Sequence, residues 1–182
     1  MGDVVARSTQ PALAAIKLAW WRERLEELDQ GKVPAEPRLQ AAAKELLPRH
    51  VTGHELAEIE AGWATLLQEQ PETDVAIQRG ANLFKLAARL LGSEFWQGLD
   101  VAGGAYAAGG LVRRGFRLNL VASADDGEKG QFLPSAPTRL RSLTALVALA
   151  VRDLERRDAT IEREATPGRA WTLLRHRITG NY

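Results

Sequence analysis

Hydrophobic residues recur at steps of three and four along most of the chain, with charged and polar residues between them. This spacing places the hydrophobic residues on one face of an α-helix. The most regular stripe begins at Ile77 and Ala81 and continues through Phe84 to Leu91. No run of alternating hydrophobic and polar residues suggests a β-strand. The pattern predicts helices at about residues 12–29, 39–46, 52–70, 77–91, 99–122, 135–154 and 171–178.

Residues that start or stop helices agree with these boundaries. Thr52 and Glu55 have the spacing of a capping box, in which two side chains satisfy free amide groups at a helix start. Pro71 ends that helix, and Gly92 stands where a left-handed C-terminal cap is expected. With no internal repeat and no linker, we expect one all-α domain over residues 1–182, a bundle of six or seven helices. Its single core should bury Trp21, Trp63, Phe84 and Leu143.

The predicted helix at 99–122 contains five glycines, Gly103, Gly104, Gly109, Gly110 and Gly115. Each lowers helix propensity by roughly 1 kcal/mol relative to alanine, so tertiary packing must hold this helix. Two explanations follow: a central helix that crosses its neighbours tightly, or a backbone that lies close to a ligand. Dinucleotide binding is disfavoured because the glycines do not follow a predicted strand.

Composition narrows the classes of function. The 182 residues include 24 basic and 23 acidic side chains, a formal net charge of +1, so no global positive field favours nucleic acid. The absence of cysteine excludes disulfides, thiolate catalysis and cysteine-rich zinc sites. No apolar run reaches the roughly 18 residues of a membrane span, and the N-terminus lacks the order of a signal peptide. We therefore expect a cytoplasmic protein.

Two pairs of charged residues are candidates for binding. Arg113 and Arg117 are one helical turn apart and can present two guanidinium groups to a diphosphate, although basic residues on a helix more often form a solvated face. Asp125 and Asp126 can hold magnesium through carboxylate oxygens, although two acids before a glycine are also ordinary turn residues. Nucleophile-elbow and phosphate-loop sequences are absent, so we assign no catalytic residue.

The histidines give little support for a metal. His50 and His54 are four residues apart but straddle the predicted start of a helix, and His176 lies far along the chain. A shared face needs both residues inside the helix, and no third clustered ligand is evident. A solvated helix cap is therefore favoured over a zinc site.

Three segments resemble the squalene/phytoene synthase family. Residues 15–28, then Gly31 and residues 34–37, are similar to the family's Leu-x-x-Trp-Arg-x-x-Leu helix and the Gly-Pro-x-x-Pro turn after it. Residues 79–92 resemble the helix that lines the family's prenyl cavity, and residues 171–182 resemble the ending of short bacterial members. The short bacterial branch, whose mitochondrial relatives include an assembly factor for respiratory complex I, is the most similar.

The resemblance implies the all-α isoprenoid-synthase bundle, in which two aspartate-rich motifs hold magnesium and prenyl diphosphates across a central cavity. This chain departs from both motifs. At the first, Asp3 is followed by Arg7 where the family has a second aspartate. At the second, residues 119–134 keep Asp125 and Asp126 only with irregular spacing. The chain also begins where an earlier helix of the family is expected, so either its start is misassigned or its bundle is reduced.

These departures shape the functional expectation. The leading hypothesis is a synthase-like protein that binds a prenyl lipid or diphosphate, or a protein partner, without catalysis. The alternative is an active farnesyl or geranylgeranyl diphosphate transferase of isoprenoid biosynthesis, which would need magnesium. Without the family's first helix, the helix at 12–29 should expose an apolar strip that association, for example as a homodimer, would cover.

Two further kinds of contact complete the set of expected partners. A purely structural interaction domain would have a partner that covers an exposed tryptophan, Trp96 or Trp171, although core packing is the more common role of tryptophan. Peripheral contact with a membrane surface is the other kind, whereas nucleic acid is excluded as a partner.

Overall fold

The computed structural model describes residues 1–93, 95–116, 135–156 and 161–180. Within these ranges the chain forms eight α-helices and no β-strand, which confirms the all-α class, and none of the helices is long and apolar enough to cross a membrane. The helices are α1 (Gly2–Ala6), α2 (Pro11–Leu28), α3 (Pro37–Glu45), α4 (Gly53–Ala64), α5 (Thr73–Leu90), α6 (Leu99–Arg113), α7 (Arg141–Glu155) and α8 (Pro167–Thr179). Single turns of 3-10 helix lie at Leu47–Arg49, Thr65–Leu67 and Thr138–Leu140.

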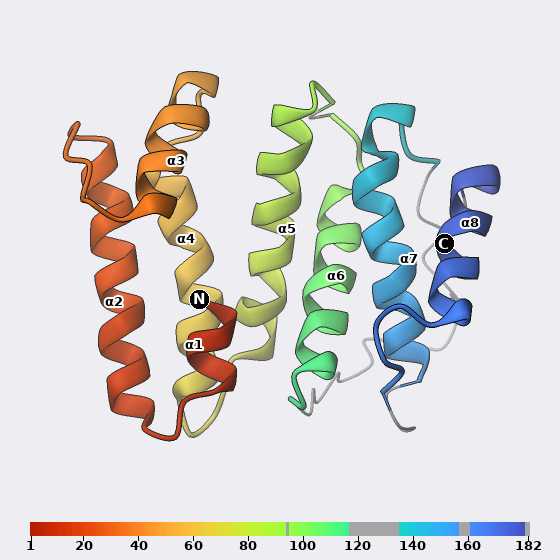
Figure 1. The fold of residues 1–182 in the computed structure, drawn as a ribbon, viewed down its shortest axis with the longest axis horizontal. Helices are drawn as coiled ribbons and strands as arrows, with labels where there is room; N and C mark the ends of the chain where they lie inside the picture. The colour runs from red at the N-terminus through yellow and green to blue at the C-terminus, as the bar shows by residue number, and fades with distance from the viewer. Residues whose placement is uncertain (94, 117–134, 157–160, 181–182) are drawn as a thin grey trace.

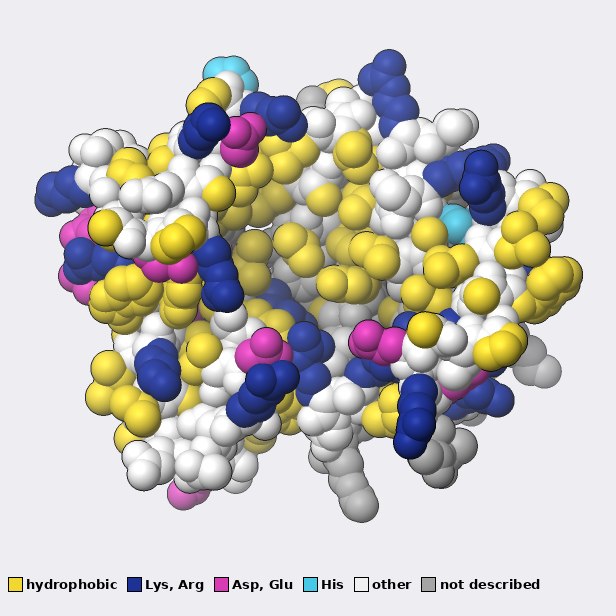
Figure 2. Space-filling view, viewed as in Figure 1, with side chains coloured by type: hydrophobic (Ala, Val, Ile, Leu, Met, Phe, Trp, Pro, Cys, Tyr) yellow, Lys and Arg dark blue, Asp and Glu magenta, His cyan; other side chains and the backbone are white. Residues whose placement is uncertain are grey.

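The long helices pack in chain order, each against the next (Figure 1). α2 packs on α4, α4 on α5, α5 on α6, α6 on α7 and α7 on α8, while the short α1 lies against α2 and α4. As a result, α2 and α8 lie at opposite ends of a row of helices. One face of this row is hollowed in the middle, and hydrophobic side chains gather there (Figure 2).

Glycines set the spacing between α6 and its neighbours. A Cβ atom on Gly80 of α5 would overlap the carbonyl oxygen of Gly103, and a Cβ on Gly103 would overlap the backbone of Gly80. On α7, the Cβ of Ala150 would lie 2.7 Å from a Cβ placed on Gly109. The glycine-rich helix therefore crosses both neighbours closely, which confirms the first explanation for its composition and offsets its low helix propensity.

The apolar core is divided into three clusters. Phe84 is buried between α5, α6 and α7, whereas Trp63 is buried in a second cluster that α1, α2, α4, α5 and α6 share. Trp21 is only half-buried, in a third cluster between α2, α3 and α4, and Leu143 is half-buried beside the first. The prediction of a single core for these four residues was wrong. A row of helices buries side chains between neighbouring helices and has no common centre.

Helix α2 carries two apolar stripes. The stripe that packs on the rest of the molecule consists of Ala14, Leu18, Leu25 and Leu28, all buried. A second stripe of Leu13, Ile16 and Trp20 is exposed. The expected apolar strip on this helix is therefore confirmed.

Several helix boundaries differ from those expected. The unpredicted α1 spans five residues, too few to show a periodic pattern. α6 ends at Arg113, before Gly115 with its φ of +82°, rather than continuing to residue 122. The helix expected to begin at residue 135 begins only at Arg141, after a 3-10 turn at Thr138–Leu140. These boundaries give eight α-helices among the described residues where six or seven were expected.

Candidate functional site

A cavity of about 330 Å³ lies in the middle of the row, between α4, α5, α6 and α7 and beside the start of α8. Much of its wall is hydrophobic and comes from Ile59, Trp63, Leu83, Tyr106, Leu146 and Leu149. Four arginines and one carboxylate also line it: Arg79, Arg113, Arg114, Arg169 and Asp153. This cavity, which we call the central groove, combines apolar walls with an excess of positive charge.

The backbone of α6 forms part of the groove at Gly110. A Cβ atom added there would meet only Nη1 of Arg114, at 3.5 Å. At Gly103 and Gly109, in contrast, an added Cβ atom would overlap a residue of α5 or α7. The second explanation for the glycine-rich helix, a backbone open to a ligand, therefore fits the geometry at Gly110.

Arg79 is the most deeply buried arginine of the groove. Only 8% of the residue is exposed, and its guanidinium carbon lies 3.6 Å from the ring centroid of Trp63. Its Nε donates to the carbonyl oxygen of Ala76 at 3.3 Å. A Cβ on Gly62 of α4 would overlap the Arg79 side chain, so this glycine makes the space that the arginine fills. Local packing thus holds the guanidinium in place at the groove wall.

Among the described residues, no carboxylate balances the positive charge of Arg79. Arg79 forms no ion pair with any residue that the structure describes. Burial and, to a smaller extent, the nearby charge of Arg114 lower the pKa of its guanidinium to about 10. Because about 10 is well above neutral pH, the side chain stays charged. A desolvated cation in an apolar wall is a favourable place for an anion.

Arg113 also lines the groove, but a carboxylate already holds it. Its Nη1 lies 3.2 Å from Oδ1 of Asp153 and donates to the carbonyl oxygen of Glu162 at 3.1 Å. Arg169 approaches the same Asp153 oxygen to 2.5 Å, and the Asp153 side chain is only 4% exposed. Glu164 lies 3.6 Å from Nη2 of Arg113. These contacts tie α6, α7 and α8 together and neutralise most of the charge on this wall.

A second ion-pair cluster supports the start of α8. Glu162 accepts from Nε of Arg152 at 2.8 Å and from Nη1 of Arg156 at 3.1 Å, and it also accepts from the hydroxyl of Thr166 at 2.5 Å. The bonds from Arg152 and Thr166 lower the pKa of Glu162 to about 2. Thr166 in turn caps α8 by accepting from the amide of Arg169 at 3.4 Å.

Of the four binding residues proposed from the sequence, one lies in the central groove and three lie outside the described residues. Arg113 lies in the groove as described, whereas Arg117, Asp125 and Asp126 lie outside the described residues. No group of three potential metal ligands among His, Cys, Asp and Glu forms within the described ranges.

The three histidines are separate in structure and in role. His50 is exposed, with a left-handed φ of 61°, and His54 is exposed in the first turn of α4. His176 is buried against Thr144, with 3.0 Å between Nε2 and the hydroxyl oxygen. The buried histidine therefore joins α8 to α7.

Arg79 and Trp63 were missed as site residues. One available signal was a charged residue three positions after Ala76 and five before Phe84, on the helix with the most regular apolar stripe. A second signal was the resemblance itself, because two residues of the segment at 79–92, Arg79 and Leu83, line the groove. The partner glycine on α4, Gly62, carries no sequence signal of its own.

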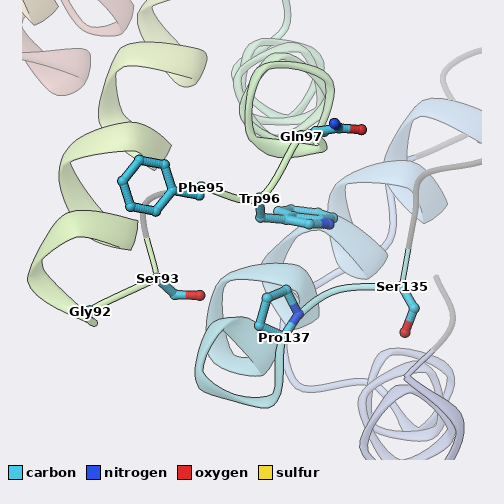
Figure 3. A pocket seen from close by; sticks show the side chains of 7 residues that line it. All are labelled: Gly92, Ser93, Phe95, Trp96, Gln97, Ser135 and Pro137. Carbon is cyan, nitrogen blue, oxygen red and sulfur yellow. The ribbon is translucent and has the colours of Figure 1, made fainter.

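A second hollow, of about 480 Å³, lies between the α5–α6 connection and the segment before α7 (Figure 3). Phe95 and Trp96 point in opposite directions there, and Phe95 is almost fully exposed. Trp96 is buried, but its Nε1 has no hydrogen-bond partner within the described part of the chain. The described lining has no charged side chain to hold a phosphate or carboxylate. The central groove is therefore the stronger candidate.

Comparison of the chain with protein-family models, with curated proteins and with solved structures found no match.

Proposed function

We infer that the central groove binds one prenyl lipid by its anionic, diphosphate-type head group, without catalysing prenyl transfer. The observation that carries this proposal is Arg79, a buried cation that has no acidic partner among the described residues and lies beside the apolar part of the groove wall. An anion there would restore the interactions that the guanidinium loses on burial. The apolar walls would hold a hydrocarbon chain. The resemblance to squalene/phytoene synthases favours a prenyl chain over other hydrocarbons.

The size of the groove supports the binding of one lipid rather than the joining of two. Its volume of about 330 Å³ is at the lower end of the roughly 300–1,000 Å³ of small-molecule sites. Head-to-head condensation requires two prenyl diphosphates side by side, with magnesium held by several carboxylates. The one carboxylate among the described groove residues, Asp153, is already shared by Arg113 and Arg169. Arginines rather than metal ions would therefore neutralise the head group.

Calorimetric titration with a non-hydrolysable farnesyl diphosphate analogue tests the proposal. Charge-assisted hydrogen bonds contribute about 1.5–3 kcal/mol, so Arg79→Met should weaken binding by about tenfold to a hundredfold. Arg49→Met, at an exposed arginine outside the groove, is the matched control and should bind as the unmodified chain does. Inorganic diphosphate should bind more weakly than the prenyl compound because it lacks contacts with the walls. Equal binding by the Arg79→Met variant would refute the assignment.

The alternative function, a prenyl diphosphate transferase, is tested separately. Labelled farnesyl or geranylgeranyl diphosphate, incubated with the chain and excess magnesium, should give no presqualene or phytoene product. If product forms and Asp125→Ala or Asp126→Ala abolishes it, the chain is a transferase and the two aspartates are metal ligands.

A further inference from the structure

Helix α8 presents an apolar face that the rest of the described molecule leaves uncovered. Trp171, Leu174 and Ile178 are spaced by three and four residues and so lie on one side of the helix. Trp171 is 65% exposed and Ile178 is 71% exposed, whereas His176 is the one buried residue of the helix. α8 itself lies at the end of the row of helices opposite α2 (Figure 1).

The charges beside this face have a single sign. α8 contains Arg169, Arg175 and Arg177 and no acidic residue. Arg175 and Arg177 are exposed, and neither forms an ion pair with a residue in the described part of the chain. The exposed stripe on α2 differs, because that helix carries three acidic and three basic side chains.

The helix is held firmly enough to act as a docking element. His176 contacts Thr144 of α7 at 3.0 Å, and Nη1 of Arg141 donates to the carbonyl oxygen of Arg177 at 3.0 Å. Its N-terminus is capped by Thr166, and Arg169 is paired with Asp153. α8 therefore keeps its exposed face fixed relative to α7 and to the groove.

We propose that α8 docks the protein on an anionic lipid surface. Trp171, Leu174 and Ile178 enter the boundary between head groups and acyl chains, and Arg175 and Arg177 contact lipid phosphates. A basic helix with tryptophan and aliphatic residues on its other face is the pattern of helices that lie in a membrane interface. Tryptophan suits the head-group level because its ring is apolar and its N–H is polar.

Docking through α8 would bring the groove close to the membrane surface. Arg169, in the first turn of the same helix, lines the groove, so the groove lies next to the helix that docks. The docking proposal does not rest on the proposed ligand, because it needs no occupant in the groove.

Co-sedimentation of the full chain with vesicles tests the proposal. The chain should bind phosphatidylcholine vesicles that contain phosphatidylserine, bind weakly to pure phosphatidylcholine, and be released as salt concentration rises. Ile178→Gln should lower the partition coefficient by about tenfold. The matched control is Ile16→Gln on the α2 stripe, at a residue that is 66% exposed, and it should leave partitioning unchanged. Arg175→Gln combined with Arg177→Gln should remove the preference for anionic vesicles.

Three outcomes would overturn the proposal. Equal binding to both kinds of vesicle would refute the role of the arginines. An equal loss in the Ile16→Gln and Ile178→Gln variants would refute α8 as the docking element. Absence of vesicle binding, together with a dimer that Ile178→Gln dissociates in light scattering, would assign the face to a second copy of the chain. Vesicles without prenyl lipid are used, so none of these results depends on ligand binding in the groove.

Discussion

The arginines on the two walls of the central groove differ in whether a carboxylate pairs with them. On the wall of α4 and α5, Arg79 is buried against Trp63 and has no acidic partner among the described residues. On the wall that the end of α6, α7 and the start of α8 form, Arg113 and Arg169 share the buried carboxylate of Asp153. Residue type alone does not distinguish the two cases. Their different surroundings decide which charge is available to a ligand.

This contrast separates a structural role from a binding role. An arginine that is paired with a buried carboxylate has its charge compensated, and removing the carboxylate leaves charges uncompensated. A buried arginine without such a partner lowers the stability of the free protein, and an anionic ligand can recover that free energy on binding. Removing Asp153 should therefore lower the stability of the free protein, whereas removing the charge of Arg79 should not.

The largest effect on stability is expected from Asp153→Asn. This change leaves Arg113 and Arg169 without their shared partner and should lower the free energy of unfolding by about 3 kcal/mol. Urea denaturation followed by circular dichroism measures it. The control is Asp100→Asn, which removes an exposed partner of Lys85, at 2.6 Å, and should change stability by less than about 1 kcal/mol. If both variants lost less than about 1 kcal/mol of unfolding free energy, Asp153 would not stabilise the fold through its arginines.

Two glycine substitutions should have effects of opposite sign. Gly62→Ala places a methyl group against the Arg79 side chain and should destabilise the protein by about 1–3 kcal/mol. Gly110→Ala meets only Nη1 of Arg114 at 3.5 Å and should stabilise it by about 0.5–1 kcal/mol through higher helix propensity. The melting temperature should therefore fall in Gly62→Ala and rise in Gly110→Ala, and thermal denaturation measures both. A stabilised Gly62→Ala would mean that Arg79 is free to move away from α4.

Glu162 should make part of the stability of the protein depend on pH in the acid range. Its pKa is about 2 in the folded protein, below its ordinary 4.5, so it stabilises the fold above about pH 4.5. That contribution is lost as pH falls from 4.5 through 2. Glu162→Gln should remove this part of the acid dependence of the melting temperature. An unchanged acid profile would show that the bonds to Arg152 and Thr166 do not stabilise α8.

Helix starts, helix ends and buried helix faces could be predicted from the sequence because residues close together in the chain specify them. The capping box of Thr52 and Glu55 forms as predicted, with both reciprocal hydrogen bonds present. The predicted stripe is buried at Ala81, Phe84 and Ala88, whereas Leu91 at its end is exposed. Gly92, expected in a left-handed cap, has a φ of +66°. These features depend on residues within a few positions of one another.

The groove depends on residues that are far apart in the chain, and this limited what the sequence could predict. Arg113 was selected because it stands near Arg117, but the partner that determines its role is Asp153, on another helix. Arg79 depends on Gly62 for space and on Trp63 for its aromatic contact, both on α4. No periodic pattern records these contacts, since they arise only when α4, α5, α6 and α7 are packed.

The unfolding free energy of Arg79→Met, measured without ligand at pH 7, shows whether the charge of Arg79 is a cost to the free protein. The lowered pKa of Arg79 corresponds to a burial cost of about 3 kcal/mol, against about 1–2 kcal/mol from the contact with Trp63. Methionine fills similar space without a charge, so the variant should be as stable as the unmodified chain or up to about 2 kcal/mol more stable. A loss of more than about 1 kcal/mol would contradict the account, because Arg79 would then stabilise the fold itself.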